Sequence, residues 1–544
     1  MALSSSILTR ILRASVAPFL VLVTPFVSYL DFNNLGLAHA EVVLALLAIA
    51  AVALVLGAVS VRSPAAAAIV LAAVLTFFID LQAREPGLKR LGLIFIALSL
   101  VLWVLRRHAA RIVGLMMATM LVLSVVPLHS QATSPDETAV RRPGAPAART
   151  DLPLVVHFLL DEQIGPEGIP ASLAPPGFKQ QLTDFYLDRG FHLFGRAYSE
   201  YPETLWSVPE LLNLSPGHFM PGLTAFGPTD GTFQLTRNAY FERLADLGYT
   251  LRVHQPDYIY LCPQRLAASC RTYPTRSLDM LQRLNVPVSA KLSIIGGTFL
   301  GQSEAYTRTR DKYQSIRLRL RTEHIPLPAW SWEQGVPVPV GAMPMFDAVA
   351  HDLSKATRGT FVFAHFLLPH YPYAYDGNCE QRFTRRWLTR SDADRADIMR
   401  GIMNVPGGRA ERYAGYFQQV RCAEKKVDAL IAAIPEPLRK DAVIIVQGDH
   451  GSRISLVDPT TVASAAPAPS DYADMFSTLF AVRAPSIAPA YDRRLTPITC
   501  LLRSLTEGEF RSVSGVDRCS APNLVFFMGS DIPQPRPLLN FWTN

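Results

Sequence analysis

The chain has 544 residues, of which 49% are hydrophobic, and a formal net charge of +7. This length allows two or more domains, and the modest charge on scattered arginines argues against nucleic-acid binding. A slight basic excess also suits a protein close to anionic lipid. The apolar residues form long blocks before residue 130 and short runs after residue 150. We therefore expect a membrane part followed by a water-exposed part.

Five N-terminal blocks are each close to the roughly 20 apolar residues that cross the hydrocarbon core of a bilayer. A cleaved signal peptide would explain only the first block, and no small-residue cleavage site stands out. The pattern predicts a bundle of five transmembrane helices within residues 1–129. The expected spans cover about 14–31, 41–61, 65–82, 91–105 and 110–128.

The charges in the short loops predict the orientation of the spans. Arg10 and Arg13 precede the first span, and the loop after it contains no Lys or Arg. Cytoplasmic loops are enriched in these residues, so we expect a cytoplasmic N-terminus. After an odd number of spans, the large C-terminal domain then lies outside the cytoplasm. In this orientation the loop after the third span also lies outside the cytoplasm, yet it contains three basic residues. These are Arg84, Lys89 and Arg90.

The cysteines predict an oxidising compartment. All six follow the spans, and an even number confined to one part of the chain is typical of disulfides. Neighbour pairing is the simplest arrangement, and six buried thiols are the alternative. No CxxC spacing occurs, so we expect no cysteine zinc site. The expected pairs are Cys262 with Cys270, Cys379 with Cys422, and Cys500 with Cys519.

Residues 130–152 are polar and rich in Pro and Ala, which indicates a linker. Beyond it, continuous apolar runs typical of buried strands alternate with helical patterns. This alternation predicts an α/β sandwich with a mostly parallel central sheet over residues 153–544. Among the expected elements are strands at about 153–160, 191–199 and 443–446, helices at 177–190 and 412–435, and a turn followed by a helix within 204–213.

Polar side chains lie at or just beyond the ends of four of these elements. Because the carboxyl ends of parallel strands share one edge of a sheet, we expect these side chains in one cleft. Carboxylates, imidazole and a hydroxyl together suit one divalent metal, with zinc as first choice and manganese, magnesium or calcium as alternatives. The residues are Asp161 and Glu162, Thr204, His365 and His370, and Asp449 and His450.

These motifs together resemble the alkaline phosphatase/sulfatase superfamily. The nearer likeness is to its membrane-anchored branch, the phosphoethanolamine transferases and lipoteichoic acid synthases. It covers about residues 153–485 and, in topology, the spans. The motifs are Thr-x-x-Ser-Val-Pro at 204–209, two histidines five apart followed by Pro372, and Asp-His-Gly at 449–451. The Cys/Ser-x-Pro-x-Arg motif of sulfatases is not met, because Leu211 stands in place of the arginine.

The resemblance implies a role for each matching residue. The metal ligands would be Glu162 with its neighbour Asp161, Thr204, Asp449 and His450. Thr204 would also be the nucleophile, and a bound cation would lower the pKa of its hydroxyl. His365 and His370 would protonate the leaving alcohol or bind phosphate oxygens. Ser452 and Arg453 depart from the acidic and glycine residues usual after Asp-His-Gly, and no histidine follows His450. We expect Arg453 to bind an anionic substrate.

The activity implied is a metal-dependent, membrane-bound transferase. It would move phosphoethanolamine or phosphoglycerol from a phospholipid donor to an envelope glycan or lipid acceptor through a phospho-threonine. We expect a monomer in a bacterial inner membrane, with the catalytic domain periplasmic or extracellular. A sulfatase-like phosphodiesterase or sulfuric ester hydrolase is an alternative, and so is a non-catalytic membrane scaffold.

Each candidate residue also has a simpler reading. Thr204 could cap the following helix, and Asp161 with Glu162 could form a polar turn. His365 could be a hydrogen-bonded histidine inside a strand, and Arg453 an exposed loop charge. Four such coincidences at matching strand ends are improbable together, which favours the functional interpretation.

Overall fold

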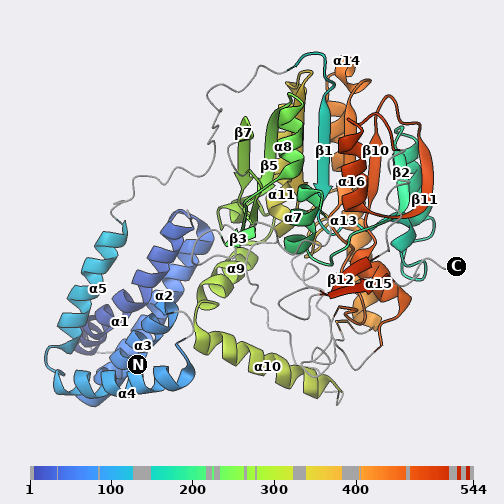
Figure 1. Ribbon diagram of the computed structural model, residues 1–544. Coiled ribbons are helices and arrows are strands. Elements are labelled where there is room, and N and C mark those ends of the chain that lie inside the picture. Colours follow the sequence, from blue (N-terminus) through green and yellow to red (C-terminus); the bar gives the residue numbers. More distant parts are fainter. Residues whose placement is uncertain are drawn as a thin grey trace. The chain divides into compact units, whose positions relative to one another are not determined.

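The computed structural model divides the chain into two compact units (Figure 1). Residues 1–132 and 276–336 form the helical unit, and residues 133–275 and 337–544 form the sheet unit. The residues described are 5–33, 35–83, 86–125, 149–215, 223–225, 233–262, 266–275, 278–322, 338–382, 403–404, 406–460, 466–513, 524–527 and 534–538.

The five predicted apolar blocks all form helices. These are α1 (Ser5–Phe32), α2 (Ala40–Ser60), α3 (Pro64–Gln82), α4 (Leu88–Val104) and α5 (Ala109–Val125). Three of them, α1 to α3, are long and apolar enough to cross a membrane, whereas α4 and α5 meet this condition only as a pair bent by 118°. Each of that pair has 17 residues, somewhat short of the roughly 20 that a bilayer core requires. The described part of the chain therefore holds three to four apolar spans by length and composition.

Helices α1 and α5 lie side by side and run in the same direction. Thr24 Oγ1 lies 3.4 Å from the carbonyl oxygen of Met117, and Ser28 Oγ lies 2.9 Å from Ser124 Oγ. The two helices are therefore parallel, and α5 ends at the same end of the helical unit as α1.

Two further helices of the helical unit come from far along the sequence and were not predicted. They are α9 (Val288–Leu300) and α10 (Glu304–Thr322), preceded by the 3-10 helix η3 (Leu278–Arg283). The ring of Phe299 in α9 packs edge-on against Phe26 of α1, with ring centroids 5.2 Å apart.

The sheet unit is built on eight strands in the order β11-β2-β10-β9-β1-β8-β5-β7. Strand β10 runs antiparallel to both neighbours, and the other pairs are parallel, which confirms the predicted mostly parallel sheet. The strands are β1 (Val155–Leu160), β2 (His192–Tyr198), β5 (Thr250–Pro256), β7 (Ser269–Tyr273), β8 (Thr360–Phe366), β9 (Val443–Gly448), β10 (Phe480–Arg483) and β11 (Ala490–Pro497).

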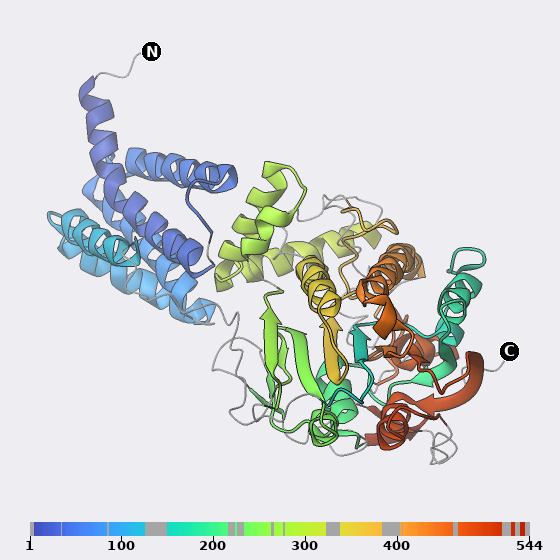
Figure 2. The same ribbon diagram turned by 90° about the horizontal axis from the view of Figure 1, so that it is seen from above.

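Helices cover both faces of this sheet, as the view from above shows (Figure 2). On one face lie α7 (Thr204–Asn213), α8 (Ala239–Asp246) and α16 (Ile498–Glu507); on the other lie α6 (Phe178–Leu187), α11 (Val338–Ser354) and α13 (Pro406–Ala433). Within β1, Leu159 joins the core under α7, α8 and α16. On the opposite face, the ring of Phe366 stacks on Phe346 of α11 with centroids 3.8 Å apart. Burial of such side chains contributes roughly 1.5–3 kcal/mol each.

Smaller elements complete the sheet unit. They are η1 (Pro166–Gly168), β3 (Leu223–Ala225), β4 (Phe233–Leu235), β6 (Ile259–Tyr260), α14 (Glu436–Arg439), α15 (Pro469–Phe476), β12 (Leu524–Phe527) and β13 (Gln534–Pro537). Two predicted disulfides are confirmed, Cys262–Cys270 and Cys379–Cys422. Cys500 is also disulfide-bonded, so the alternative of six thiols is wrong, while its predicted partner Cys519 lies outside the described residues.

The register of the three central strands sets the position of the site. Leu160, the last residue of β1, lies opposite Phe366 of β8 and Gly448 of β9. These three strands therefore end at one level. The residues that follow, beginning with Asp161 and Asp449, are delivered to the same edge of the sheet.

Candidate metal and active site

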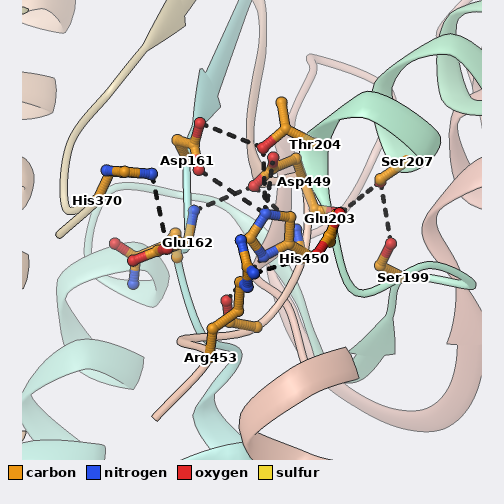
Figure 3. Close-up of polar contacts among 12 residues, drawn as sticks. Asp161, Glu162, Ser199, Glu203, Thr204, Ser207, His370, Asp449, His450 and Arg453 are labelled. Atoms are coloured by element: carbon orange, nitrogen blue, oxygen red, sulfur yellow. Dashed lines mark hydrogen bonds and ion pairs between the residues drawn. The ribbon is translucent and has the colours of Figure 1, made fainter. Parts of the chain in front are cut away.

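Four predicted residues converge at this edge (Figure 3). Thr204 Oγ1 lies 3.4 Å from Asp161 Oδ2 and 3.2 Å from His450 Nε2. His450 Nε2 in turn lies 3.3 Å from Asp449 Oδ2 and 3.8 Å from Asp161 Oδ1. All four side chains are buried. Two carboxylates, an imidazole nitrogen and a hydroxyl thus surround one small volume.

Backbone hydrogen bonds aim the Asp449 and His450 side chains into this volume. Asp449 Oδ1 accepts from the N–H groups of Glu162 and His450 at 3.0 and 2.9 Å, and its Oδ2 has no hydrogen-bond partner. His450 Nδ1 lies 2.9 Å from the carbonyl oxygen of Gly451, which can only accept, so Nδ1 carries the proton. The lone pair of Nε2 then faces the carboxylates, which is the arrangement of a metal-binding histidine.

The charges at this edge fit a divalent cation. Burial, together with the neighbouring Asp449, raises the pKa of Asp161 to about 7. Asp161 Oδ1 also lies buried without a hydrogen-bond partner. Buried carboxylates that lack a countercharge are unfavourable, and a divalent cation would supply both charge and coordination.

Two overlapping sets of side chains could hold such a cation. One is Asp161, Glu162 and His370, and the other is Asp161, His365 and Asp449; within each set the ligand atoms lie within 4.8 Å of one another. Asp161 belongs to both sets. The family resemblance favoured Glu162 as the metal carboxylate, whereas the geometry places Asp161 at the centre.

The two predicted histidines have different surroundings. His365, in β8, is fully buried, and its Nε2 lies 3.5 Å from Asp161 Oδ2. Burial lowers the pKa of His365 to about 4, so its imidazole is neutral and able to bind a metal. The His370 side chain is 29% exposed, and its Nε2 lies 3.7 Å from Glu162 Oε1. His370 is thus the one of the pair that solvent and substrate can reach.

Glu162 is held in an unusual backbone conformation. Its φ of 62° lies in the left-handed region, which costs a non-glycine residue about 1–2 kcal/mol. The Tyr416 hydroxyl secures this turn by donating to the Glu162 carbonyl at 2.6 Å and accepting from Ile164 N at 2.8 Å. Glu162 Oε2 accepts from the N–H of Tyr371 at 3.1 Å, which points the carboxylate towards His370. Tyr416 lies on α13, and no motif in the sequence marked it.

Thr204 is the first residue of α7 and does not cap it. The cap position belongs to Glu203, and the Thr204 hydroxyl is directed at the acidic cluster instead. Ser207, the serine of the Thr-x-x-Ser-Val-Pro motif, donates to the Asp449 carbonyl at 2.5 Å and lies 3.0 Å from Ser199 Oγ. It ties α7 to the end of β9. The positive end of the helix also favours an anion beside Thr204.

Arg453 lies beside this helix end (Figure 3). Its Nη2 donates to Glu203 Oε1 at 3.1 Å, and its side chain is 32% exposed. Its φ of 56° is again left-handed. The preceding Ser452 is buried and contacts the Tyr413 hydroxyl at 2.9 Å, so it belongs to the packing beneath the site. Glu203, which sequence reasoning did not single out, holds Arg453 in place.

Comparison with known protein families gives a match over part of the chain. Residues 337–479 match the family model described as Sulfatase, which confirms the superfamily resemblance over this segment. This segment contains His365, His370, Asp449 and Arg453. No curated protein matches the chain.

Solved structures resemble the chain at low identity. A 2-O GAG sulfatase is 14% identical, with 67% of this chain and 71% of that chain covered and a TM-score of 0.37. The phosphonate monoester hydrolase of Agrobacterium radiobacter is 13% identical, with 69% and 80% covered and a TM-score of 0.38. The C-terminal periplasmic domain of EcEptC from Escherichia coli, in complex with Zn, is 11% identical, with 71% and 92% covered and a TM-score of 0.38. No function follows from likeness at this level.

Proposed function

We propose that this chain is a metal-dependent, membrane-bound phosphotransferase that uses Thr204 as its nucleophile. The observation that carries the proposal is the Thr204 hydroxyl, which lies at a helix N-terminus within 3.4 Å of Asp161 Oδ2 and 3.2 Å of His450 Nε2. A merely structural threonine at a helix start would cap the helix, and this one does not. The site would take a phospholipid headgroup such as phosphoethanolamine or phosphoglycerol.

The metal would be held by Asp161, Asp449 and His450, with His365 as a further ligand. When bound, a divalent cation lowers the pKa of a nearby hydroxyl and neutralises charge on the transferred phosphoryl group. Zinc suits the mixed oxygen and imidazole donors best. The Thr204 proton has an acceptor within reach in Asp161 Oδ2, 3.4 Å away, because a carboxylate can bind a metal through its other oxygen.

The reaction has two balanced halves. In the first, Thr204 Oγ1 gives its proton to Asp161 and forms a bond to phosphorus, the bond from phosphorus to the diacylglycerol oxygen breaks, and His370 gives that oxygen a proton. In the second, an acceptor hydroxyl loses its proton to His370 and attacks phosphorus, the bond from phosphorus to Thr204 Oγ1 breaks, and Asp161 returns the proton to Thr204. The partial exposure of His370 at the edge of the cluster supports this role. Arg453 would bind the non-transferred phosphate oxygens or an anionic acceptor.

The membrane helices supply the setting for a lipid donor. Helix α5 ends at the same end of the helical unit as α1, which supports a sheet unit on the side of the membrane opposite the N-terminus. We propose a multi-pass protein of a bacterial inner membrane whose site faces the periplasm or exterior. Its acceptor would be an envelope glycan or lipid, and it would act as a monomer.

The test uses the purified full chain with zinc and either labelled phosphatidylethanolamine or phosphatidylglycerol. We expect release of diacylglycerol and a phospho-headgroup on the Thr204 peptide by mass spectrometry. Release of free headgroup phosphate without any acceptor would instead indicate a phosphodiesterase that passes the same intermediate to water. Absence of both products with every metal would contradict the proposal and leave the scaffold alternative.

A further inference from the structure

The chain returns to the helical unit in the middle of the sheet unit. Residues 278–322 follow β7 and precede α11, yet they pack with the apolar helices. Gln282 Nε2 donates to Glu41 Oε1 at 2.6 Å, at the start of α2. The Tyr29 hydroxyl, near the end of α1, donates to Thr298 Oγ1 at 2.5 Å. Both contacts lie where α1 ends and α2 begins.

The start of α10 is fixed at the end of α3. Asp80 accepts from the backbone N–H groups of Glu304 and Ala305, at 3.0 and 3.2 Å, and from Ser303 Oγ at 2.5 Å. A carboxylate in this position satisfies the free N–H groups of a helix start and complements its dipole. Gly87 N, just before α4, donates to Glu304 Oε2 at 2.5 Å. Helix α10 therefore begins at the turn between two apolar helices, where the bilayer surface is expected.

The composition of α10 differs from that of every helix around it. Its sequence, EAYTRTRDKYQSIRLRLRT, carries six basic and two acidic residues. Both acidic residues are paired within the helix, Glu304 with Arg308 at 2.6 Å and Asp311 with Arg310 at 2.8 Å. The helix thus presents a strong positive charge beside the apolar bundle.

We propose that α10 lies on the bilayer surface and binds the phosphate groups of anionic phospholipids. Arg308, Lys312 and Ile316 are spaced four residues apart, so they share one face, and all three are exposed. Basic side chains on such a face bind lipid phosphates, while an apolar side chain beside them enters the headgroup region. The charge complementarity and the continuity with the apolar helices identify the bilayer as the partner. The inference does not depend on the reaction at Thr204.

The test places a reporter on α10 of the full chain. Ser315 is exposed, and the cysteines of the described residues are all in disulfides, so Ser315→Cys gives a single labelling position. A fluorophore there is read in lipid nanodiscs that contain headgroup-spin-labelled lipid. The nanodiscs contain either phosphatidylcholine alone or phosphatidylcholine with phosphatidylglycerol. We expect at least twofold stronger quenching with the anionic lipid.

Two charge reversals in the Ser315→Cys background complete the design. Lys312→Glu should abolish most of the increase caused by phosphatidylglycerol. Lys440→Glu, at a 76% exposed position of the sheet unit, makes the same charge change and should leave the increase intact. Lys312→Arg keeps the positive charge and should retain the increase in quenching. Retention would show that the loss in Lys312→Glu comes from the charge and not from misfolding. Equal quenching in both nanodiscs, or an increase that survives Lys312→Glu, would overturn the proposal.

Discussion

The backbone N–H of Glu162 donates to Asp449 Oδ1 at 3.0 Å and so joins two strand ends that are 287 residues apart in sequence. The bond occupies one carboxylate oxygen and leaves the other 3.3 Å from His450 Nε2. The ends of β1 and β9 are therefore held together by the same side chain that faces the candidate metal position.

Asp449→Asn separates these two roles. The asparagine oxygen can still accept from the N–H groups of Glu162 and His450, so we expect a folded protein. The neutral amide removes one of the negative charges, and zinc affinity should fall by at least about 10–100-fold. Zinc content after dialysis is the measurement, with Asp458→Asn as the control outside the cluster. Full zinc occupancy in Asp449→Asn would place the metal elsewhere.

Thr204→Ala removes the proposed nucleophile and leaves the carboxylates in place. We expect headgroup transfer to fall by about 10³-fold or more and the phospho-adduct to vanish, while zinc is retained. Thr204→Ser keeps a hydroxyl and should keep measurable transfer. Diacylglycerol release and intact-protein mass spectrometry read both variants. Normal transfer by Thr204→Ala would show that another group attacks phosphorus.

Ser207→Ala distinguishes the phosphotransferase from a sulfatase that modifies its serine. Loss of the hydroxyl leaves the buried Asp449 carbonyl without this donor, which should cost about 1–3 kcal/mol of unfolding free energy. We expect reduced but measurable transfer, because Ser207 only positions α7. Ser199→Ala spares the bond to Asp449 but removes two contacts with the Tyr201 backbone, so it should also lower stability while leaving the end of β9 joined to α7. Complete inactivation, with an altered mass of the Ser207 peptide in wild type, would favour the sulfatase reading.

Arg453→Lys tests recognition of the anionic substrate. Lysine keeps the charge but loses the two-pronged hydrogen bonding of the guanidinium, so KM for the lipid donor should rise severalfold with little change in kcat. Glu203→Gln should lower KM, because it weakens the ion pair that competes with substrate for Arg453. Steady-state kinetics with phosphatidylethanolamine measures both variants. Unchanged KM in both would exclude Arg453 from substrate binding.

Glu200→Gln should change how stability depends on pH. Burial raises the pKa of Glu200 to about 7, and its Oε1 has no hydrogen-bond partner. The folded state therefore holds this proton more tightly than the unfolded state. Proton binding at Glu200 therefore stabilises the folded state. This stabilisation is complete below the ordinary glutamate pKa and is lost as pH rises through about 7. The difference corresponds to about 3 kcal/mol at most.

Glutamine removes this titration, so the Tm of Glu200→Gln should exceed that of wild type at pH 8. At pH 5 the two Tm values should nearly coincide. Thermal unfolding of the full chain at both pH values gives the comparison, and Glu436→Gln, 75% exposed, is the control. Parallel pH profiles for wild type and Glu200→Gln would contradict the burial argument.

The ends of β1 and β9 could be predicted because both strands are largely apolar and are followed at once by acidic residues, Asp161 and Asp449. Parallel geometry alone then brings Asp161 and Asp449 to one edge, and the register of Leu160 with Phe366 and Gly448 realises it. Which of Asp161 and Glu162 would lie beside Thr204 could not be predicted. It depends on the left-handed conformation of Glu162 and on a hydrogen bond from Tyr416, 254 residues away.

The contribution of residues 278–322 to the helical unit was also beyond prediction. Helix α9 is a short apolar helix of 13 residues, and such a run resembles any buried helix of a globular domain. Its partners Phe26 and Tyr29 lie inside a predicted span and carry no mark of a contact so distant in sequence. Similarly, the sequences of α4 and α5 predict two separate spans. In the structure the two helices are long enough for one span only when they are taken together as a bent pair.

The chain passes from the sheet unit to the helical unit and back, so the sheet unit is not one continuous segment. This affects how the sheet unit can be expressed without the membrane helices. A fragment that begins at residue 133 would still contain α9, whose apolar surface would then lack Phe26 and Tyr29 and would promote aggregation. Deletion of residues 276–336 removes this surface as well. Thr275 and Gly341 are neighbours, since a side chain built on Gly341 would lie 3.1 Å from Thr275 Cα. A few glycines could therefore close the gap and yield a soluble sheet unit for crystallisation with zinc.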